Sequence, residues 1–435
     1  MKIAIVGAGI AGLGAALALS ERADVRVFEK ASRIGGHANT VDAVFPDGVQ
    51  PVDTGFIVYN ERNYPNLCAL FAELDVPTKW SDMSFGFSLD DGACEYACDS
   101  VSKIFAQRWR AADPRFLWMT REILRFISTG PRELTAGRLD GLSLGDWLSA
   151  SRFSRWFRER FILPMGGAIW STSAKEVLDF PASAFMRFFV NHDLMTGLAP
   201  AQRWRTVDGG SREYVRRVHA RLGPRLALGC AVVAVETATG RPELRFADGS
   251  VEAFDQVVLA VHGPQARALI ATPDSQQAQL LSAFRTTENR AVLHSDARLM
   301  PKRRRVWSSW NFMADSDETE TPRAAQVTYW MNRLQSLPAH RPLFVSLNPR
   351  VEIAPEAVHA ELSYAHPFYD GKSFAAQRDM DLIQGRGGIW YAGAWLSYGF
   401  HEDGLRAGLR VAAALGARPA WAVDLGVPFA GAQAA

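Results

Sequence analysis

The sequence predicts an α/β protein, α+β overall, built from two interleaved domains. Three observations predict this class. A strand, a glycine-rich turn and a helix open the chain, similar strand and helix patterns return near residues 205–265 and 385–420, and the stretches between them carry aromatic residues in other patterns. The 435 residues, 48% apolar and 22% charged, have the length and composition of a globular protein with more than one domain.

The charge balance and the cysteines limit location and partners. Lys plus Arg total 48 and Asp plus Glu total 46, which is too even for a surface built to bind nucleic acid. Four scattered cysteines without a CxxC pair predict reduced thiols, no cysteine-based metal site and a cytoplasmic location. The apolar run over residues 3–19 contains four glycines and is too short to span a membrane.

The first forty residues contain a nucleotide-binding pattern. The turn after the first strand is formed by Gly7, Gly9, Ala11 and Gly12. The first glycine permits the turn, the second lets backbone N–H groups approach a pyrophosphate, and the third lets the helix pack on the strand. A second strand, 25–28, ends at Glu29, where an acid accepts hydrogen bonds from a ribose. Together they predict a Rossmann-like dinucleotide-binding unit, and a glycine-rich packing turn is the alternative.

The following residues distinguish FAD from NAD. They are Lys30, Arg33, Gly35, Gly36, His37 and Thr40, followed at the end of a new extended stretch by Thr54 and Gly55. The segment resembles the RxGGxxxT motif of amine oxidases, phytoene desaturases and protoporphyrinogen oxidases, FAD-binding proteins of the glutathione-reductase-like second group. The resemblance implies FAD, with Arg33 near phosphate and the two glycines alongside the cofactor. These families usually carry Arg at the position of His37, so a titratable ring replaces a fixed charge.

Two later segments extend the resemblance. A helix over 212–222 and a β-meander follow residue 207, and the resemblance places Val233 near the adenine. Near the carboxyl end, Gly393 and Trp395 precede an Ala-rich helix, whose start at Gly404 and Leu405 is implied to face the flavin. This motif lacks the cysteine that tethers flavin in some monoamine oxidases, so we expect non-covalent FAD. The sequence contains no second strand, GxGxxG turn and helix, so we expect no NADPH-binding domain. The electrons are therefore expected to come from the substrate.

The domain boundaries follow from these segments. Residues 1–62, 205–265 and 385–420 are predicted to form the FAD-binding domain, 63–204 and 266–384 a substrate domain of antiparallel sheet plus helices, and 421–435 a C-terminal tail. In the first insert, Asp113 as N-cap and Gly130-Pro131 as the end bracket a helix, and Ser143 with Asp146 starts another. In the second insert, aromatic and polar residues alternate over 302–312 and 327–335, which predicts strands facing a pocket.

A basic aromatic segment lies within the first insert. Residues 101–165 contain twelve Lys or Arg and six Asp or Glu, and the most mixed stretch contains Arg152, Arg155, Trp156, Phe157, Arg158 and Arg160. Such a pattern suits peripheral docking on an anionic membrane. It predicts that the cytoplasmic protein can also lie at the inner face of the cell membrane. An ordinary helix with buried rings and solvated arginines is the alternative.

Nearly the whole chain also resembles a narrower group. Residues 33–40, 168–171, 309–311 and 328–335 are similar to a bacterial flavoprotein family found beside cyclopropane-fatty-acid-synthase-like methyltransferases. The resemblance implies desaturation of a methyl-branched unsaturated acyl chain of a phospholipid, on the route to furan fatty acids, and a methyltransferase as partner.

This reaction needs hydride transfer from an allylic carbon to flavin N5 and loss of a neighbouring proton. Trp170 is expected to stabilise the cation with its π face, and His401 or Tyr398 to accept the proton, with His192 and Glu402 as further acceptors. Amine oxidation is an alternative, although residues 288–294 lack the Lys that such enzymes commonly use. A non-redox flavin-dependent isomerase and a non-catalytic FAD-binding partner are further alternatives.

Overall fold

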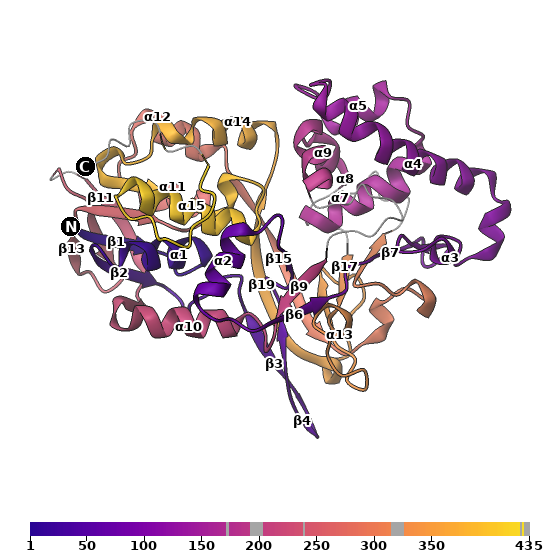
Figure 1. The fold of residues 1–435 in the computed structure, drawn as a ribbon, viewed down its shortest axis with the longest axis horizontal. Coiled ribbons are helices and arrows are strands. Elements are labelled where there is room, and N and C mark those ends of the chain that lie inside the picture. The colour runs from indigo at the N-terminus through magenta and orange to yellow at the C-terminus, as the bar shows by residue number, and fades with distance from the viewer. Residues whose placement is uncertain (171–173, 192–202, 238–239, 315–325, 427–428, 430–435) are drawn as a thin grey trace.

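The computed structural model describes residues 1–170, 174–191, 203–237, 240–314, 326–426 and 429. Figure 1 shows two lobes connected by long strands: a first lobe on the left, and on the right a second lobe in which a layer of helices lies over a sheet. The mixture of helices and sheets agrees with the predicted class.

The first lobe is built on a five-stranded parallel sheet. Its order is β10 (Leu226–Leu228), β2 (Asp24–Glu29), β1 (Lys2–Val6), β14 (Gln256–Leu259) and β20 (Ile389–Tyr391). Because side chains alternate along a strand, Ile3 and Ile5 enter one core and Ala4 and Val6 enter another. Apolar residues on both faces of β1 are typical of a parallel sheet covered on both sides.

Different elements cover the two faces of this sheet. The core on one face includes α1 (Ile10–Leu19), α10 (Arg212–Leu222) and α15 (His401–Ala414). The core on the other face includes the meander β11 (Val232–Glu236), β12 (Glu243–Phe246) and β13 (Val251–Ala253), with α11 (Gly263–Leu269), α12 (Ser275–Ser282) and α14 (Gly371–Asp379). The first lobe therefore has three layers.

The second lobe contains a seven-stranded sheet. Its order is β19 (Val358–Phe368), β15 (Arg285–His294), β18 (Phe344–Leu347), β17 (Gln326–Trp330), β16 (Trp310–Ala314), β7 (Phe85–Leu89) and β8 (Cys94–Ala97), antiparallel except for β16 beside β7. The helical layer consists of α3 (Val101–Ile104), α4 (Pro114–Thr135), α5 (Leu144–Ala150), α6 (Arg155–Phe157), α7 (Leu163–Trp170), α8 (Ala174–Asp179) and α9 (Ala182–Asn191). A large, mainly aromatic core joins helices and sheet.

Short elements complete the structure. They are the hairpin β3 (Thr40–Phe45) and β4 (Gly48–Asp53), the small sheet β5 (Tyr59–Asn60), β9 (Trp204–Val207) and β6 (Thr78–Ser81), and the helices α2 (Pro65–Glu73) and α13 (Met331–Leu334). The small sheet pairs β9 with β5 on one side and β6 on the other.

Most predicted elements are confirmed, including the strand, turn and helix at the amino end and both N-caps, Asp113 and Ser143. Three boundaries differ. Of the strand predicted over 302–312, residues 304–306 form a turn of 3-10 helix, and β16 begins only at Trp310. Helix α4 continues through Pro131 to Thr135, because burial of Phe126 and Gly130 outweighs the hydrogen bond lost at a proline. Residues 331–334 form α13 instead of continuing a strand.

The basic aromatic segment lies inside the helical layer. Phe157 is fully buried among Phe126, Phe153 and Phe161, so the prediction that the Phe157 ring contacts a membrane is wrong. The packing of α6 on α4 turns this ring inward. The ring of Trp156 is partly covered by the Arg160 guanidinium, 4.3 Å from its centroid, whereas Arg152 and Arg155 stay exposed. No helix among the described residues is long and apolar enough to cross a membrane.

Packing crosses the predicted domain boundaries. Helix α2 packs on α15, and its Leu67, Leu70 and Phe71 belong to a core of the first lobe, although 63–204 was assigned to the substrate domain. Helices α12 and α14 also pack in the first lobe. Ala422, Leu425 and Phe429 are buried there as well, so the described part of the predicted tail is packed.

Leu405 tests the contact between α15 and α1. The side chain is fully buried, and a Cβ added to Gly14 of α1 would lie 2.5 Å from its Cδ1. Leu405→Ala is expected to lower the free energy of unfolding by about 2 to 5 kcal/mol, because it leaves a cavity. Denaturant unfolding measures this. Leu382→Ala, at an exposed leucine, is the matched control, with an expected change within about 0.5 kcal/mol; equal effects would exclude the packing role.

Candidate active site

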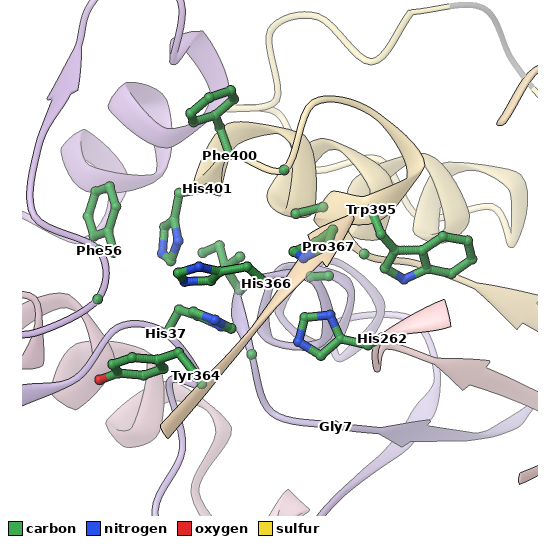
Figure 2. Close-up of a pocket in the computed structure, with 18 of the residues that line it drawn as sticks. Gly7, His37, Phe56, His262, Tyr364, His366, Pro367, Trp395, Phe400 and His401 are labelled. Atoms are coloured by element: carbon green, nitrogen blue, oxygen red, sulfur yellow. The ribbon is translucent and has the colours of Figure 1, made fainter. Parts of the chain in front are cut away.

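A cavity of about 740 Å³ opens at the carboxyl ends of β1, β2, β14 and β20 and extends into the second lobe. Open parallel sheets bind nucleotides at this edge. In Figure 2, side chains from the amino-terminal segment, from β19 and from α15 surround the same space. The site is therefore assembled from segments far apart in the sequence.

The glycine turn after β1 leaves room for a ligand. A Cβ built on Gly9 has no atom within 4 Å, and Gly9 lines the cavity, whereas a Cβ on Gly12 would lie 2.0 Å from the Gly7 carbonyl oxygen. Gly7 has a φ of +103°, which favours glycine. The structure thus agrees with the three predicted roles: turn, open cradle and close packing of helix on strand.

Glu29 lies at the edge of this cradle. Its carboxylate accepts the N–H of Ala8 at 2.8 Å and of Ala31 at 2.9 Å, and its remaining lone pairs are available to ribose hydroxyls. Arg33 instead donates to the carbonyl of Gly36 at 3.0 Å and does not line the cavity. The Arg33 side chain therefore bonds to its own loop, and its contact with a phosphate stays a prediction.

A buried carboxylate fixes the segment that carries Thr54 and Gly55. Asp53 accepts hydrogen bonds from Thr40 Oγ1 at 2.6 Å, from Ser211 Oγ at 2.7 Å and from Gln335 Nε2 at 2.9 Å. Burial raises the pKa of Asp53, while the hydrogen bonds from Thr40 and Ser211 oppose that rise. Three distant parts of the chain thereby place Thr54 at the cavity wall.

Histidines surround the middle of the cavity: His37, His262, His366 and His401. The His37 ring centroid lies 5.8 Å from that of His262 and 5.7 Å from that of His366. Burial lowers the pKa of His37 to about 3, of His366 to about 4 and of His401 to about 3, and it also lowers that of His262. The four imidazoles are therefore neutral near pH 7. The described residues contain no group of His, Cys, Asp or Glu placed to hold a metal ion.

The tautomer of His366 is set by two asparagines. Asn289 Oδ1 accepts a hydrogen bond from Asn348 Nδ2 at 2.8 Å, which identifies the other amide atom of Asn289 as Nδ2. That nitrogen lies 3.1 Å from His366 Nδ1. A neutral imidazole that accepts at Nδ1 carries its proton on Nε2, so His366 is a hydrogen-bond donor at Nε2 and not a base there.

The three predicted catalytic residues line the cavity. His401 Nε2 lies 2.7 Å from the Tyr214 hydroxyl, and its ring stacks on Phe56 with centroids 4.0 Å apart. Trp170 packs on Phe180 and Phe188, and its buried Nε1 has no hydrogen-bond partner among the described residues.

The two further candidate proton acceptors, Glu402 and His192, are not placed at the cavity by the described structure. Glu402 accepts the N–H groups of Asn66 and Leu67 at the start of α2 and does not line the cavity. The prediction that it accepts a substrate proton is wrong, because its carboxylate caps a helix. His192 lies outside the described residues.

The end of the cavity in the second lobe is apolar. Its walls include Met83, Phe85, Ile169, Trp170, Phe188, Trp204, Trp310, Tyr329 and Leu347. Among the described lining residues, Glu29 and Lys30 are the only Asp, Glu, Lys or Arg, and both belong to the nucleotide end. The described residues of this end can therefore bury a hydrocarbon and offer no counter-ion for a charged group.

Thirteen of the seventeen predicted cofactor-binding residues line the cavity: Gly7, Gly9, Ala11, Glu29, Lys30, Gly35, Gly36, His37, Thr54, Gly55, Val233, Gly393 and Trp395. The other four are Gly12, Arg33, Gly404 and Leu405. Gly404 and Leu405 pack α15 on α1, and the helix begins earlier, at His401.

The sequence analysis missed His262, Tyr364 and His366. A usable signal existed for each. His262 follows the end of β14 closely, where parallel strands place ligand-binding residues. Tyr364 and His366 are two apart in β19, so they share one face of the sheet.

The residues present fit FAD. Gly9 borders an open cradle, Glu29 lies at its edge, and the buried Nε2 of His37 has no partner among the described residues although the ring lines the cavity. A cavity that accepts a dinucleotide at one end and an apolar molecule at the other defines a dinucleotide-dependent oxidoreductase. The family model described as flavin-containing amine oxidoreductase matches residues 10–339, and the chain belongs to this family. FAD is its cofactor.

Solved structures share the fold. Putrescine oxidase bound to putrescine has 18% identity and a TM-score of 0.67, over 95% of this chain and 98% of that one. Cyclohexylamine oxidase from Brevibacterium oxydans IH-35A has 16% identity and a TM-score of 0.65, also over 95% of this chain and 98% of that one. A fatty acid isomerase from P. acnes has 14% identity and a TM-score of 0.63, over 94% of this chain and 96% of that one. No curated protein sequence matches this chain.

Glu29 tests the ribose contact. Glu29→Ala is expected to weaken FAD binding by about 1 to 3 kcal/mol, because ribose hydroxyls lose their acceptor and the Ala8 N–H loses its partner. Titration of FAD into the apoprotein, followed by flavin fluorescence, measures the affinity. Glu21→Ala, at an exposed position before β2, is the control. Wild-type affinity in Glu29→Ala would assign the ribose to another residue.

His401 is expected to link stability to pH. Its pKa is lowered to about 3 in the folded protein, whereas an unfolded histidine titrates near about 6.5. Between these values the unfolded chain binds one more proton, so stability falls as the pH decreases.

His401→Phe removes that proton. The slope of unfolding free energy against pH should decrease by up to about 1.4 kcal/mol per pH unit in this range. Denaturant unfolding at several pH values measures the slope, with His219→Asn at an exposed position on α10 as control. An unchanged slope would show that His401 is protonated in the folded protein.

Proposed function

We propose that the protein is an FAD-dependent desaturase of a methyl-branched, unsaturated acyl chain of a phospholipid. The observation that carries the proposal is the apolar end of the cavity, where no described lining residue carries a formal charge. We also assign the first lobe to the glutathione-reductase-like second group, and propose a cytoplasmic protein with a methyltransferase as its supplier of substrate.

Amine oxidation is less well supported by this cavity. A protonated amine in an apolar cavity needs a counter-ion or an aromatic cage. The described lining residues of the second lobe include no carboxylate, so an ammonium group would depend on aromatic faces such as those of Trp170 and Tyr329 alone. The amide of Asn289, which fixes His366, lies in the β15 segment that lacks a lysine. Family membership and shared fold therefore do not decide the substrate.

The residues divide the chemistry among themselves. FAD, when bound, supplies the acceptor for a hydride from the allylic carbon. The faces of Trp170 and Tyr398 stabilise the resulting cation by about 1 to 2 kcal/mol. In the tautomer in which His401 Nε2–H donates to the Tyr214 hydroxyl, Nδ1 accepts the neighbouring proton. The substrate thus loses a hydride and a proton and becomes a conjugated diene.

Anaerobic mixing tests the function. The oxidised holoprotein is mixed with detergent-dispersed phospholipid that carries a methyl-branched monounsaturated chain, and the visible flavin absorbance is followed. We expect bleaching and formation of one diene for each flavin reduced. Bleaching by putrescine or cyclohexylamine but not by lipid would establish an amine oxidase, and a shifted double bond without bleaching would establish an isomerase.

Trp170 gives the matched variant test. Trp170→Leu is expected to slow flavin bleaching about tenfold, because it removes about 1 to 2 kcal/mol of cation stabilisation, while FAD content stays at the wild-type level. Trp80→Leu changes an exposed tryptophan outside the cavity and should leave the rate unchanged. Equal rates in the two variants would remove Trp170 from the mechanism.

A further inference from the structure

The second lobe exposes apolar side chains over a short stretch of sequence. Fifteen large apolar residues of the described chain are exposed, and five of them lie between residues 101 and 124: Val101, Trp109, Leu117, Trp118 and Leu124. Leu124 is 60% exposed and Trp118 51%. Single exposed apolar residues are ordinary, but a concentration of this kind marks an interaction surface.

Three of these residues lie on one side of α4. Positions 117, 121, 124, 128 and 132 repeat at intervals of three or four, so they follow one stripe of the helix, and Trp118 lies beside it. The opposite stripe, with Phe116, Met119 and Phe126, is buried in the lobe. We name the outward stripe the α4 face; it comprises Leu117, Trp118, Arg121, Leu124, Ser128 and Arg132.

The charge on the α4 face is positive and not neutralised within the described structure. Arg121 and Arg132 form no ion pair with a described residue, and the Arg121 guanidinium lies 5.0 Å from the Trp118 ring centroid. The acids of the helix are engaged elsewhere: buried Glu122 accepts from the N–H of Ser154 at 2.8 Å, and Glu133 pairs with Arg138 at 2.8 Å. Apolar side chains and unpaired arginines therefore face solvent together.

We propose that the α4 face docks the protein on an anionic phospholipid bilayer. Leucine and tryptophan side chains enter the interfacial region of a bilayer, and arginines beside them bind anionic headgroups. This location replaces the segment over 152–160, whose Phe157 is in the core. The proposal does not depend on which substrate the flavin oxidises.

The α4 face has a short structural route to the cavity. Phe126, on the buried side of α4, packs on Phe189 of α9 with centroids 6.0 Å apart. The neighbouring residue, Phe188, lines the cavity. One layer of helix thus separates the docking surface from the apolar end of the site, and Figure 1 shows α4 and α9 together in the helical layer of the second lobe.

Vesicle sedimentation of the FAD-loaded protein tests the proposal. We expect binding to vesicles of phosphatidylcholine with phosphatidylglycerol, a decrease as salt rises, and no binding to phosphatidylcholine alone. L117S/L124S should weaken the partition coefficient about tenfold or more, and R121Q/R132Q about fivefold for each charge. W80S and R22Q, which change an exposed tryptophan and an arginine of the first lobe, should bind like the wild type.

A second measurement locates the contact. Brominated phospholipid should quench less tryptophan fluorescence in W118F than in the wild type. Absence of binding to anionic vesicles, equal binding to both vesicle types, or wild-type binding by L117S/L124S with normal FAD content would each overturn the proposal. A dimer in sedimentation velocity that L117S/L124S converts to a monomer would also overturn it, because the occupant of the face would then be a second copy of the chain.

Discussion

The buried carboxylate of Asp53 is the interaction on which the site depends. It receives hydrogen bonds from Thr40, which ends the first nucleotide-binding segment, from Ser211, which begins α10, and from Gln335 of the second lobe. Hydrogen bonds to a charged group are each worth about 1.5 to 3 kcal/mol, and a buried charge without them is costly. The carboxylate therefore requires all three segments to be in place.

Several features follow from that constraint. Thr54, next to Asp53, bonds the Tyr364 hydroxyl at 2.7 Å, and Asn39 bonds the same hydroxyl at 2.9 Å. Tyr364 lies beside His37, with ring centroids 5.2 Å apart. Polar contacts thus run from Asp53 through Thr54 to Tyr364, and they connect the amino-terminal segment with strand β19.

Burial decides the electrostatics of the cavity. The imidazoles of His37, His366 and His401 remain uncharged because desolvation outweighs every other influence on their pKa values. A neutral ring has one donor and one acceptor nitrogen, and partners outside the cavity, such as Asn289 for His366, select which is which. At the other end, the described walls are mainly aromatic and carry no formal charge, so the cavity combines a polar nucleotide end with an apolar chamber.

The sequence by itself determined the local parts. The strand, turn and helix at Lys2 to Leu19, the acid at Glu29 and the caps at Asp113 and Ser143 follow from short-range rules of backbone geometry and spacing, and the structure has them where predicted. Only the tertiary structure decided which side chains meet. Phe157 is buried while Trp118 is exposed, and Glu402 caps α2, because burial and partners come from segments distant in sequence. Local signals mark His262 and His366 as candidates, but only the packing of distant segments brings them to His37.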